Sequence, residues 1–275
     1  RCGTGVRLSG FSHGTDVWLG NAKDLILSGT ATVKDTIGCR DDIMLYLISR
    51  GMEPKRSFKI MEAVRKGRGL PDGAEQEMRD HGVPDWYIES CRKIKYLFPK
   101  AHAVAYVMMG FRIAFFKVHY PLQYYSAYFY RRSQKDAFDA AIMIQGVDFV
   151  RRKINEIDSK ADATAKEQDL RTTLEAVYEF YMRGFDFAPI DLYESDESKF
   201  LVVGDRQLRP PFVSLSGLGE AAARDLVAAR EGGREFISIE ELSMACPKLS
   251  QAHIEQRKSV GALNSLPDES QMSFF

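Results

Sequence analysis

The stretch FPKAHAVAYVMMGFRIAFFKVHYPLQYYSAYFY, residues 98–130, decides most about the fold. Pro99 suits the first turn of a helix, where no N–H is needed, and Pro121 cannot continue one. The residues between them therefore predict a single helix from about Lys100 to His119. An apolar stripe at helical spacing most often packs into a core, and here it comprises Val104, Val107, Met108, Phe111 and Phe115.

Helical patterns also fill the rest of the first half of the chain. After a short opening that we expect to be extended, SHGTDVWLGNAKDLILSG (residues 12–29) indicates a loop that leads into a helix. Apolar residues at helical spacing predict one helix that ends at Gly51 and another within residues 53–70. A third begins at Pro84 and Asp85, because both residues favour helix starts.

The second half continues as helices with one exception. Residues 136–184 are helical in pattern and carry many acidic side chains. Residues 200–208 contain an apolar run followed by a Gly-Asp turn, which predicts a small β-hairpin. Short helices return from Gly217 to about Val260. The fold class is therefore mainly α with a small β element.

The composition is that of an ordinary globular protein, with 45% hydrophobic and 28% charged residues in a chain of 275. The four cysteines form no CxxC pair, which argues against zinc and disulfides and for free thiols in a reducing cytoplasm. No signal peptide opens the chain, and no apolar run approaches the roughly 20 residues of a membrane helix. We expect a soluble, cytoplasmic protein without a membrane partner, whose first residue is a cut end.

The formal net charge is zero, but the charges are unevenly spread. Residues 86–135 contain nine Lys and Arg side chains and a single acid, Glu89, whereas residues 136–200 are rich in acids. A basic block beside an acidic one indicates a surface for phosphates. The alternative is a chance distribution over solvated helix faces.

The start of the helix at Lys100 has the chemistry of a triphosphate site. A helix N-terminus attracts anions, and Lys100 and His102 lie in its first turn. Tyr106 follows His102 by four residues and shares its face, so it is placed to lie under a base or sugar. The alternative is a surface lysine and a structurally satisfied histidine. Arg40, beside two aspartates, is more often part of a local ion pair than a ligand.

The segment SLSGLGEAAARDLVAARE, residues 214–231, has the form of a helix-hairpin-helix. Its glycines permit positive φ and a close approach to a DNA phosphate, while the leucine between them plugs the core. Such contacts ignore base identity. An ordinary tight turn is the alternative, and KLSQAHIEQRKSVGAL (residues 248–263) is a candidate degenerate second copy. The candidate DNA contacts, including those of an ambiguous basic run upstream, are Ser216, Gly217, Leu218, Gly219, Arg65, Lys66 and Arg68.

The chain ends in a polar stretch followed by two aromatic residues. A Gln amide with spaced apolar anchors is typical of a short linear docking peptide. The anchors here are Gln271, Met272, Phe274 and Phe275. The alternative is a tail that packs back on its own domain.

Long blocks of the sequence resemble the fingers of PolC-type DNA polymerase III α subunits. These blocks are SHGTDVWLGNA, TIGCRDDIM, SFKIMEAVRKG, VPDWYIESCRKIKYLFPKAHAVAYV and FKVHYPLQYYSAYF. SGLGEAAARDLVAAREGG resembles the duplex-binding helix-hairpin-helix region of that family, and QMSFF resembles its C-terminal pentapeptide that binds the sliding clamp (β subunit). The tail departs from the usual Gln-Leu-x-Leu-Phe pattern at Met272 and Phe274, which both remain apolar.

This resemblance implies the C-terminal part of a replicative polymerase that adds dNTPs to a primer 3′ end on a template. The family uses two Mg²⁺ ions held by palm aspartates, which by resemblance lie upstream of Arg1. We therefore expect no catalytic residue and no metal ligand in this chain. The implied partners are primer-template DNA, dNTPs, the sliding clamp and other replisome subunits. The implied dNTP-binding residues are Arg40, Lys100, His102, Tyr106 and His13.

The expected organisation has four parts. They are a fingers subdomain (1–135), a helical connection with the β-hairpin (136–205), a helix-hairpin-helix duplex-binding module (206–265) and a flexible clamp-binding tail (266–275). A second hypothesis is a non-catalytic module that binds DNA and tethers a clamp. A palm with paired aspartates upstream would distinguish the first hypothesis from the second.

Overall fold

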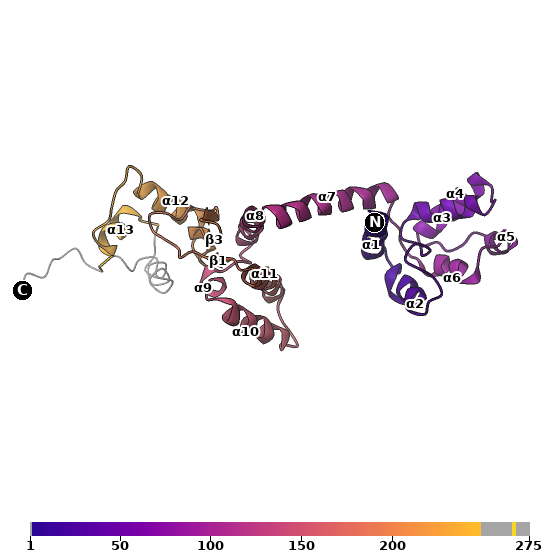
Figure 1. Cartoon of the computed structure of the whole chain (residues 1–275), viewed down its shortest axis with the longest axis horizontal. Coiled ribbons are helices and arrows are strands. Elements are labelled where there is room, and N and C mark those ends of the chain that lie inside the picture. The colour runs from indigo at the N-terminus through magenta and orange to yellow at the C-terminus, as the bar shows by residue number, and fades with distance from the viewer. Residues whose placement is uncertain (1, 249–265, 268–275) are drawn as a thin grey trace, which may run out of the picture. The chain divides into compact units, whose positions relative to one another are not determined.

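The computed structural model describes residues 2–248 and 266–267 (Figure 1). The chain divides between residues 114 and 115, within the long helix α7 (Lys100–His119), into two compact units. We call residues 1–114 the N-terminal unit and residues 115–275 the C-terminal unit. The prediction of a mainly α fold with a small β element is confirmed.

The N-terminal unit is built from helices joined by loops, with one isolated β-bridge between Thr15 and Tyr96 among its described residues. Its elements before α7 are α1 (Cys2–His13), the irregular turn η1 (Trp18–Ala22), α2 (Lys23–Leu27), α3 (Arg40–Ser49), α4 (Pro54–Arg65), α5 (Ala74–Asp80) and α6 (Asp85–Lys93). The start of α4 shows why these ends fall where they do: Pro54 occupies the first turn, and the Glu53 carboxylate accepts hydrogen bonds from two backbone N–H groups. The core of this unit includes Ile43, Leu47 and Ile60, all with no exposed surface.

The opening of the chain is a helix, so the expectation of an extended opening is wrong. Three glycines weaken the helical signal of this segment because glycine is a poor helix former. The structure explains why residue 10 is a glycine: a methyl group there would lie 1.9 Å from the carbonyl oxygen of Gly38. Helix α1 is therefore specified by close packing against the loop before α3.

Helix α7 runs from Lys100 to His119, as the flanking prolines predicted. The expectation that its apolar stripe packs into a core is wrong for the described residues, because Ala103 alone is buried. Four stripe residues are exposed: Val104, Met108, Phe111 and Phe115. The spacing of apolar residues predicts which face of a helix is apolar, but it does not show whether another segment packs against that face.

By length and composition, α7 is also the one helix in the described part of the chain that could cross a membrane, with a mean hydropathy of 1.3 over its best window. The sequence-based exclusion of any such run was therefore too strong. One such helix is only a weak indication, and three cationic side chains lie within it. They are Lys100, Arg112 and Lys117, of which Lys117 is ion-paired with Glu179 at 2.7 Å.

The C-terminal unit packs helices against a small sheet. Its elements after α7 are α8 (Pro121–Ser133), α9 (Ala140–Met143), α10 (Val147–Asp158), α11 (Ala165–Met182), β1 (Asp186–Phe187), β2 (Leu201–Val203), β3 (Gln207–Arg209), η2 (Phe212–Ser214), α12 (Glu220–Ala229) and α13 (Ile239–Ala245). The predicted hairpin is confirmed as the antiparallel pair β2–β3. A third strand, β1, adds parallel to β3 and was not predicted.

The core of this unit is rich in aromatic side chains. Tyr125 and Phe129 from α8 meet Phe180 from α11, with ring centroids 5.1 and 5.7 Å from Phe180. Tyr125 also donates a hydrogen bond of 2.6 Å to the Glu179 carboxylate. These contacts join α8 to α11 and support the sheet and hairpin that follow.

Candidate functional site

Five ring-bearing side chains form a continuous series at the start of α7. We call Tyr96, Phe98, His102, Tyr106 and His13 the aromatic row. Within it, Phe98 and His102 are stacked with centroids 4.7 Å apart and planes 12° apart, and His102 lies 4.7 Å from Tyr106. His13 comes from α1 and lies 5.1 Å from Tyr106.

The aromatic row is partly open to solvent. Tyr96 is 41% exposed and Tyr106 is 52% exposed. The structure therefore brings together three of the predicted dNTP-binding residues: His13, His102 and Tyr106. Exposed flat rings are suited to stacking on nucleobases.

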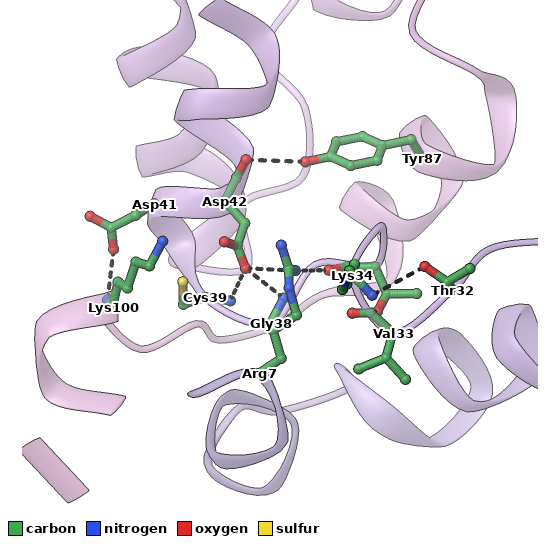
Figure 2. Close-up of polar contacts among 11 residues, drawn as sticks. Arg7, Thr32, Val33, Lys34, Gly38, Cys39, Asp41, Asp42, Tyr87 and Lys100 are labelled. Atoms are coloured by element: carbon green, nitrogen blue, oxygen red, sulfur yellow. Dashed lines mark hydrogen bonds and ion pairs between the residues drawn. The ribbon is translucent and has the colours of Figure 1, made fainter. Parts of the chain in front are cut away.

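Lys100 lies beside the aromatic row in sequence but lines a different feature. Its side chain borders a pocket of about 590 Å³ that is also lined by Arg7, Lys34, Asp42 and Arg50. We call this the basic pocket. The backbone N–H of Lys100 donates a 2.7 Å hydrogen bond to the Asp41 carboxylate (Figure 2). One N–H of the α7 N-terminus is therefore already used by an acid of the protein.

Asp42 organises the floor of the basic pocket. Figure 2 shows its Oδ2 accepting hydrogen bonds from the backbone N–H groups of Gly38 and Cys39, each at 3.0 Å, and from Arg7 Nη1 at 3.1 Å. Arg7 Nη1 also donates to the Thr36 carbonyl oxygen. The loop before α3 thus fixes both the carboxylate and the guanidinium.

Arg40 lies in another group of charges and does not line the basic pocket. Its guanidinium is 3.7 Å from the Glu62 carboxylate and 4.0 Å from that of Asp41. Arg65 and Lys66 also pair with Glu62. The hydrogen bond from Arg65 lowers the pKa of Glu62 to about 2. Three of the predicted ligands, two of them for DNA, therefore surround one carboxylate.

Arg68, the remaining member of the basic run, has a different environment. Its side chain is exposed and makes no hydrogen bond or ion pair among the described residues, although its backbone N–H donates to the Ala63 carbonyl oxygen. Of the three DNA candidates upstream, Arg68 is the one whose charge is least compensated locally.

The hairpin at residues 216–219 has the predicted form. Gly217 has φ of +83°, a conformation that side chains disfavour, and Leu218 is 5% exposed and belongs to the core. Gly219 precedes the first turn of α12, and a Cβ at either glycine would meet no atom within 4 Å. The space beside these two glycines is therefore not filled by neighbouring atoms of the described structure.

Ser216 is exposed, but its backbone N–H is directed at Asp139 of the same unit. Together with Asp139 it lines a cavity of about 230 Å³. Burial raises the pKa of Asp139, although backbone hydrogen bonds from Ala141 and Ser216 act in the opposite direction. The amide of Ser216 is thus engaged with a carboxylate of its own unit.

Two predicted features cannot be placed. The candidate second hairpin copy (residues 248–263) lies almost wholly outside the described residues, and so do Gln271, Met272, Phe274 and Phe275. Within the described ranges, no three His, Cys, Asp or Glu side chains gather as ligands of a metal ion. The side chains described here do not provide a fitting Mg²⁺ site.

Two family models match the chain. Residues 6–83 match the bacterial DNA polymerase III alpha subunit finger domain, and residues 184–272 match a helix-hairpin-helix motif. The first match covers most of α1 and the pocket residues Arg7, Lys34, Asp42 and Arg50 but ends before Lys100, and the second covers the hairpin. Together they define the class: a polymerase finger domain followed by a helix-hairpin-helix motif.

Comparison with individual proteins identifies the family more narrowly than the two family models do. The chain is 52% identical over 271 residues to DNA polymerase III PolC-type of Caldanaerobacter subterraneus subsp. tengcongensis, 50% identical over 270 residues to that of Thermotoga petrophila, and 51% identical over 271 residues to that of Bacillus cereus. Each match covers 98% of this chain and 18–19% of the relative. The chain therefore spans about a fifth of the length of these relatives. By sequence it corresponds to a segment of PolC-type DNA polymerase III, which confirms the resemblance drawn from its motifs.

Sequence reasoning missed four residues of these features. Arg7 and Lys34 were not singled out, because neither lies in a motif and the pocket that joins them to Lys100 forms only on folding. Phe98 and Tyr96 lie just before the predicted helix, within the basic block. Aromatic residues among cationic ones are typical of nucleic-acid binding, and this pattern could have identified both residues.

Proposed function

We propose that this chain is part of a replicative DNA-directed DNA polymerase and holds the incoming dNTP and the primer-template duplex. The observation that carries the proposal is the aromatic row beside Lys100. Flat rings next to an uncompensated ammonium group suit a nucleotide, which has a stacking base and a charged polyphosphate. The homology to PolC-type DNA polymerase III supports the same conclusion.

In this proposal the aromatic row supports the nascent base pair. His102 and Tyr106 offer adjacent rings to a base, and stacking of this kind tolerates all four bases because each has a π face. Lys100 binds the triphosphate and neutralises its charge. Arg40 contributes through its charge group with Glu62 and Asp41. These side chains orient the nucleotide, which lowers the entropy cost of reaction.

The chemical step belongs to residues outside this chain. Two Mg²⁺ ions, when bound, activate the primer hydroxyl and stabilise the leaving pyrophosphate, and we assign their ligands to a preceding part of the polymerase. We infer that the isolated chain, given primer-template, dNTPs and Mg²⁺, extends no primer.

The hairpin of the C-terminal unit is proposed to grip the duplex. The uncrowded glycine turn at residues 217–219, together with the N-terminus of α12, supports contacts to phosphates without regard to base identity. Arg68 is proposed as a further phosphate contact. The last five residues are proposed to dock on the sliding clamp and thereby bring the polymerase to the replisome, within the cytoplasm.

The aromatic row is tested by single-nucleotide incorporation with the full-length polymerase that contains these residues. Tyr106→Leu removes the ring, and Tyr106→Phe keeps it. Loss of a stacked base costs about 1–3 kcal/mol, so Tyr106→Leu is expected to lower kcat/KM for dNTPs by about 5- to 150-fold, while Tyr106→Phe retains most of it. Equal values for Tyr106→Leu and the parent would exclude the row from nucleotide binding.

A further inference from the structure

We propose that Arg7 and Lys34 bind the polyphosphate of the nucleotide together with Lys100 in the basic pocket. The inference rests on the proposed function and adds two ligands to it. It also places the phosphate end of the nucleotide between α1, the loop at residues 32–36, α3 and α6.

The charges of the pocket are unbalanced in favour of cations. Arg7, Lys34, Arg50 and Lys100 line it, against two carboxylates, those of Asp35 and Asp42. Both carboxylates have partners within the protein. Asp35 accepts hydrogen bonds from the N–H and hydroxyl of Thr32 at 3.0 and 2.6 Å, and Asp42 accepts three as described above.

The two lysine ammonium groups have no such partner. Among the described residues, neither Lys34 Nζ nor Lys100 Nζ makes a hydrogen bond or an ion pair, and both side chains are exposed. A second cavity of about 370 Å³ is also lined by both lysines and by Arg7. Ammonium groups in a shared concavity repel each other, and a multiply charged anion between them removes that repulsion.

Arg7 is held in place before any ligand arrives. Its Nη1 donates to Asp42 and to the Thr36 carbonyl oxygen, and its side chain is 24% exposed. Both hydrogens of Nη1 are thereby used, which leaves the N–H groups of Nε and Nη2 for an anion. Guanidinium groups bind phosphate oxygens through two parallel hydrogen bonds, and a fixed guanidinium loses little entropy on doing so.

The pocket and the aromatic row share two segments of the chain. Helix α1 supplies Arg7 to the pocket and His13 to the row. Residues 98–106 supply Lys100 to the pocket and the remaining rings, apart from Tyr96, to the row. One molecule with a base at one end and a polyphosphate at the other can therefore use both. The pocket's volume is within the range of small-ligand sites.

The inference is tested by titration calorimetry on the full 275-residue chain with inorganic tripolyphosphate, which has no base, and with dGTP. The variants are Lys34→Ala, Arg7→Ala and Lys100→Ala. The control is Lys59→Ala, which removes an exposed lysine of α4 that has no partner among the described residues. Lys34→Ala is the deciding variant because it removes no hydrogen bond or ion pair among the described residues, whereas Arg7→Ala leaves Asp42 without its cation.

We expect Lys34→Ala and Arg7→Ala each to weaken tripolyphosphate binding about tenfold or more, because a hydrogen bond to a charged group is lost in each case. Lys59→Ala should leave it unchanged, and higher salt should weaken binding in the parent chain. Parent-like affinity of Lys34→Ala overturns the inference, as does an absence of tripolyphosphate binding by the parent. If Lys100→Ala alone loses dGTP affinity, the proposed function stands and the added ligands are wrong.

Discussion

Replacing Gly10 by alanine tests how α1 is positioned, because two effects of opposite sign compete there. In a helix interior, glycine is less favourable than alanine by about 1 kcal/mol, so the substitution gains that amount from helix propensity. The structure places the new methyl group 1.9 Å from the carbonyl oxygen of Gly38, and 3.2 Å from its Cα. A backbone carbonyl cannot rotate away as a long side chain can, so α1 or the loop has to move.

Overpacking of this kind costs about 1–3 kcal/mol. A contact as short as this one lies at the upper end, so the net effect of Gly10→Ala should be a loss of about 1–2 kcal/mol. Gly3→Ala is the matched control, since it lies in the same helix and its methyl group would meet no atom within 4 Å. That variant should be unchanged or more stable by up to about 1 kcal/mol.

Urea unfolding followed by tryptophan fluorescence measures this difference in the correct part of the chain. Both tryptophans, Trp18 and Trp86, lie in the N-terminal unit, so the signal reports on that unit alone. The midpoint should fall for Gly10→Ala and stay or rise for Gly3→Ala, with similar slopes. Equal midpoints for the two variants would refute the packing of α1 against the Gly38 loop.

Three further predictions concern DNA, acid and the tail. Replacing Gly217 and Gly219 together by valine should weaken duplex binding by the chain and reduce its salt dependence, since phosphate contacts are lost. Unchanged affinity at several salt concentrations, in a variant whose far-UV circular dichroism matches the parent, would exclude the hairpin. Arg65 holds the pKa of Glu62 at about 2 against an ordinary 4.5, so this carboxylate stabilises the fold fully above about pH 4.5 and ceases to do so as pH falls toward 2. Glu62→Gln should reduce the pH dependence of the free energy of unfolding between about pH 4.5 and 2. If this dependence is unchanged, the ion pairs of Glu62 do not contribute to stability. Removing residues 271–275 from the polymerase should preserve synthesis on short primed templates and abolish stimulation by the clamp on long ones. Full stimulation of the truncated polymerase by the clamp would exclude the tail from docking.

Local signals in the sequence were sufficient for several elements. The ends of α7 follow from Pro99 and Pro121, whose backbone restrictions act wherever they occur. The turn between β2 and β3 and the start of α12 follow from glycines in the same way. Such features depend on a few neighbouring residues, and the structure therefore reproduces them.

Features that depend on distant contacts could not be predicted. The sequence of α1 has a weak helix propensity because of its glycines, and its packing against Gly38 stabilises the helix. The basic pocket joins Arg7, Lys34 and Lys100, which are 27 to 93 residues apart, so no spacing rule identifies it. The sequence also contains no sign that the Arg40 guanidinium would lie between Glu62 and Asp41, the carboxylate that accepts the Lys100 N–H.

The central claim is that the start of α7 binds the incoming nucleotide of a DNA polymerase. The most direct test is steady-state dNTP incorporation by the full-length polymerase with Lys100→Ala, compared with Lys59→Ala. Loss of a charged hydrogen bond to the triphosphate predicts that Lys100→Ala lowers kcat/KM for dNTPs by about 10- to 100-fold, with unchanged affinity for primer-template. Lys59→Ala should match the parent. Unchanged kcat and KM for dNTPs in a folded Lys100→Ala polymerase would contradict the account.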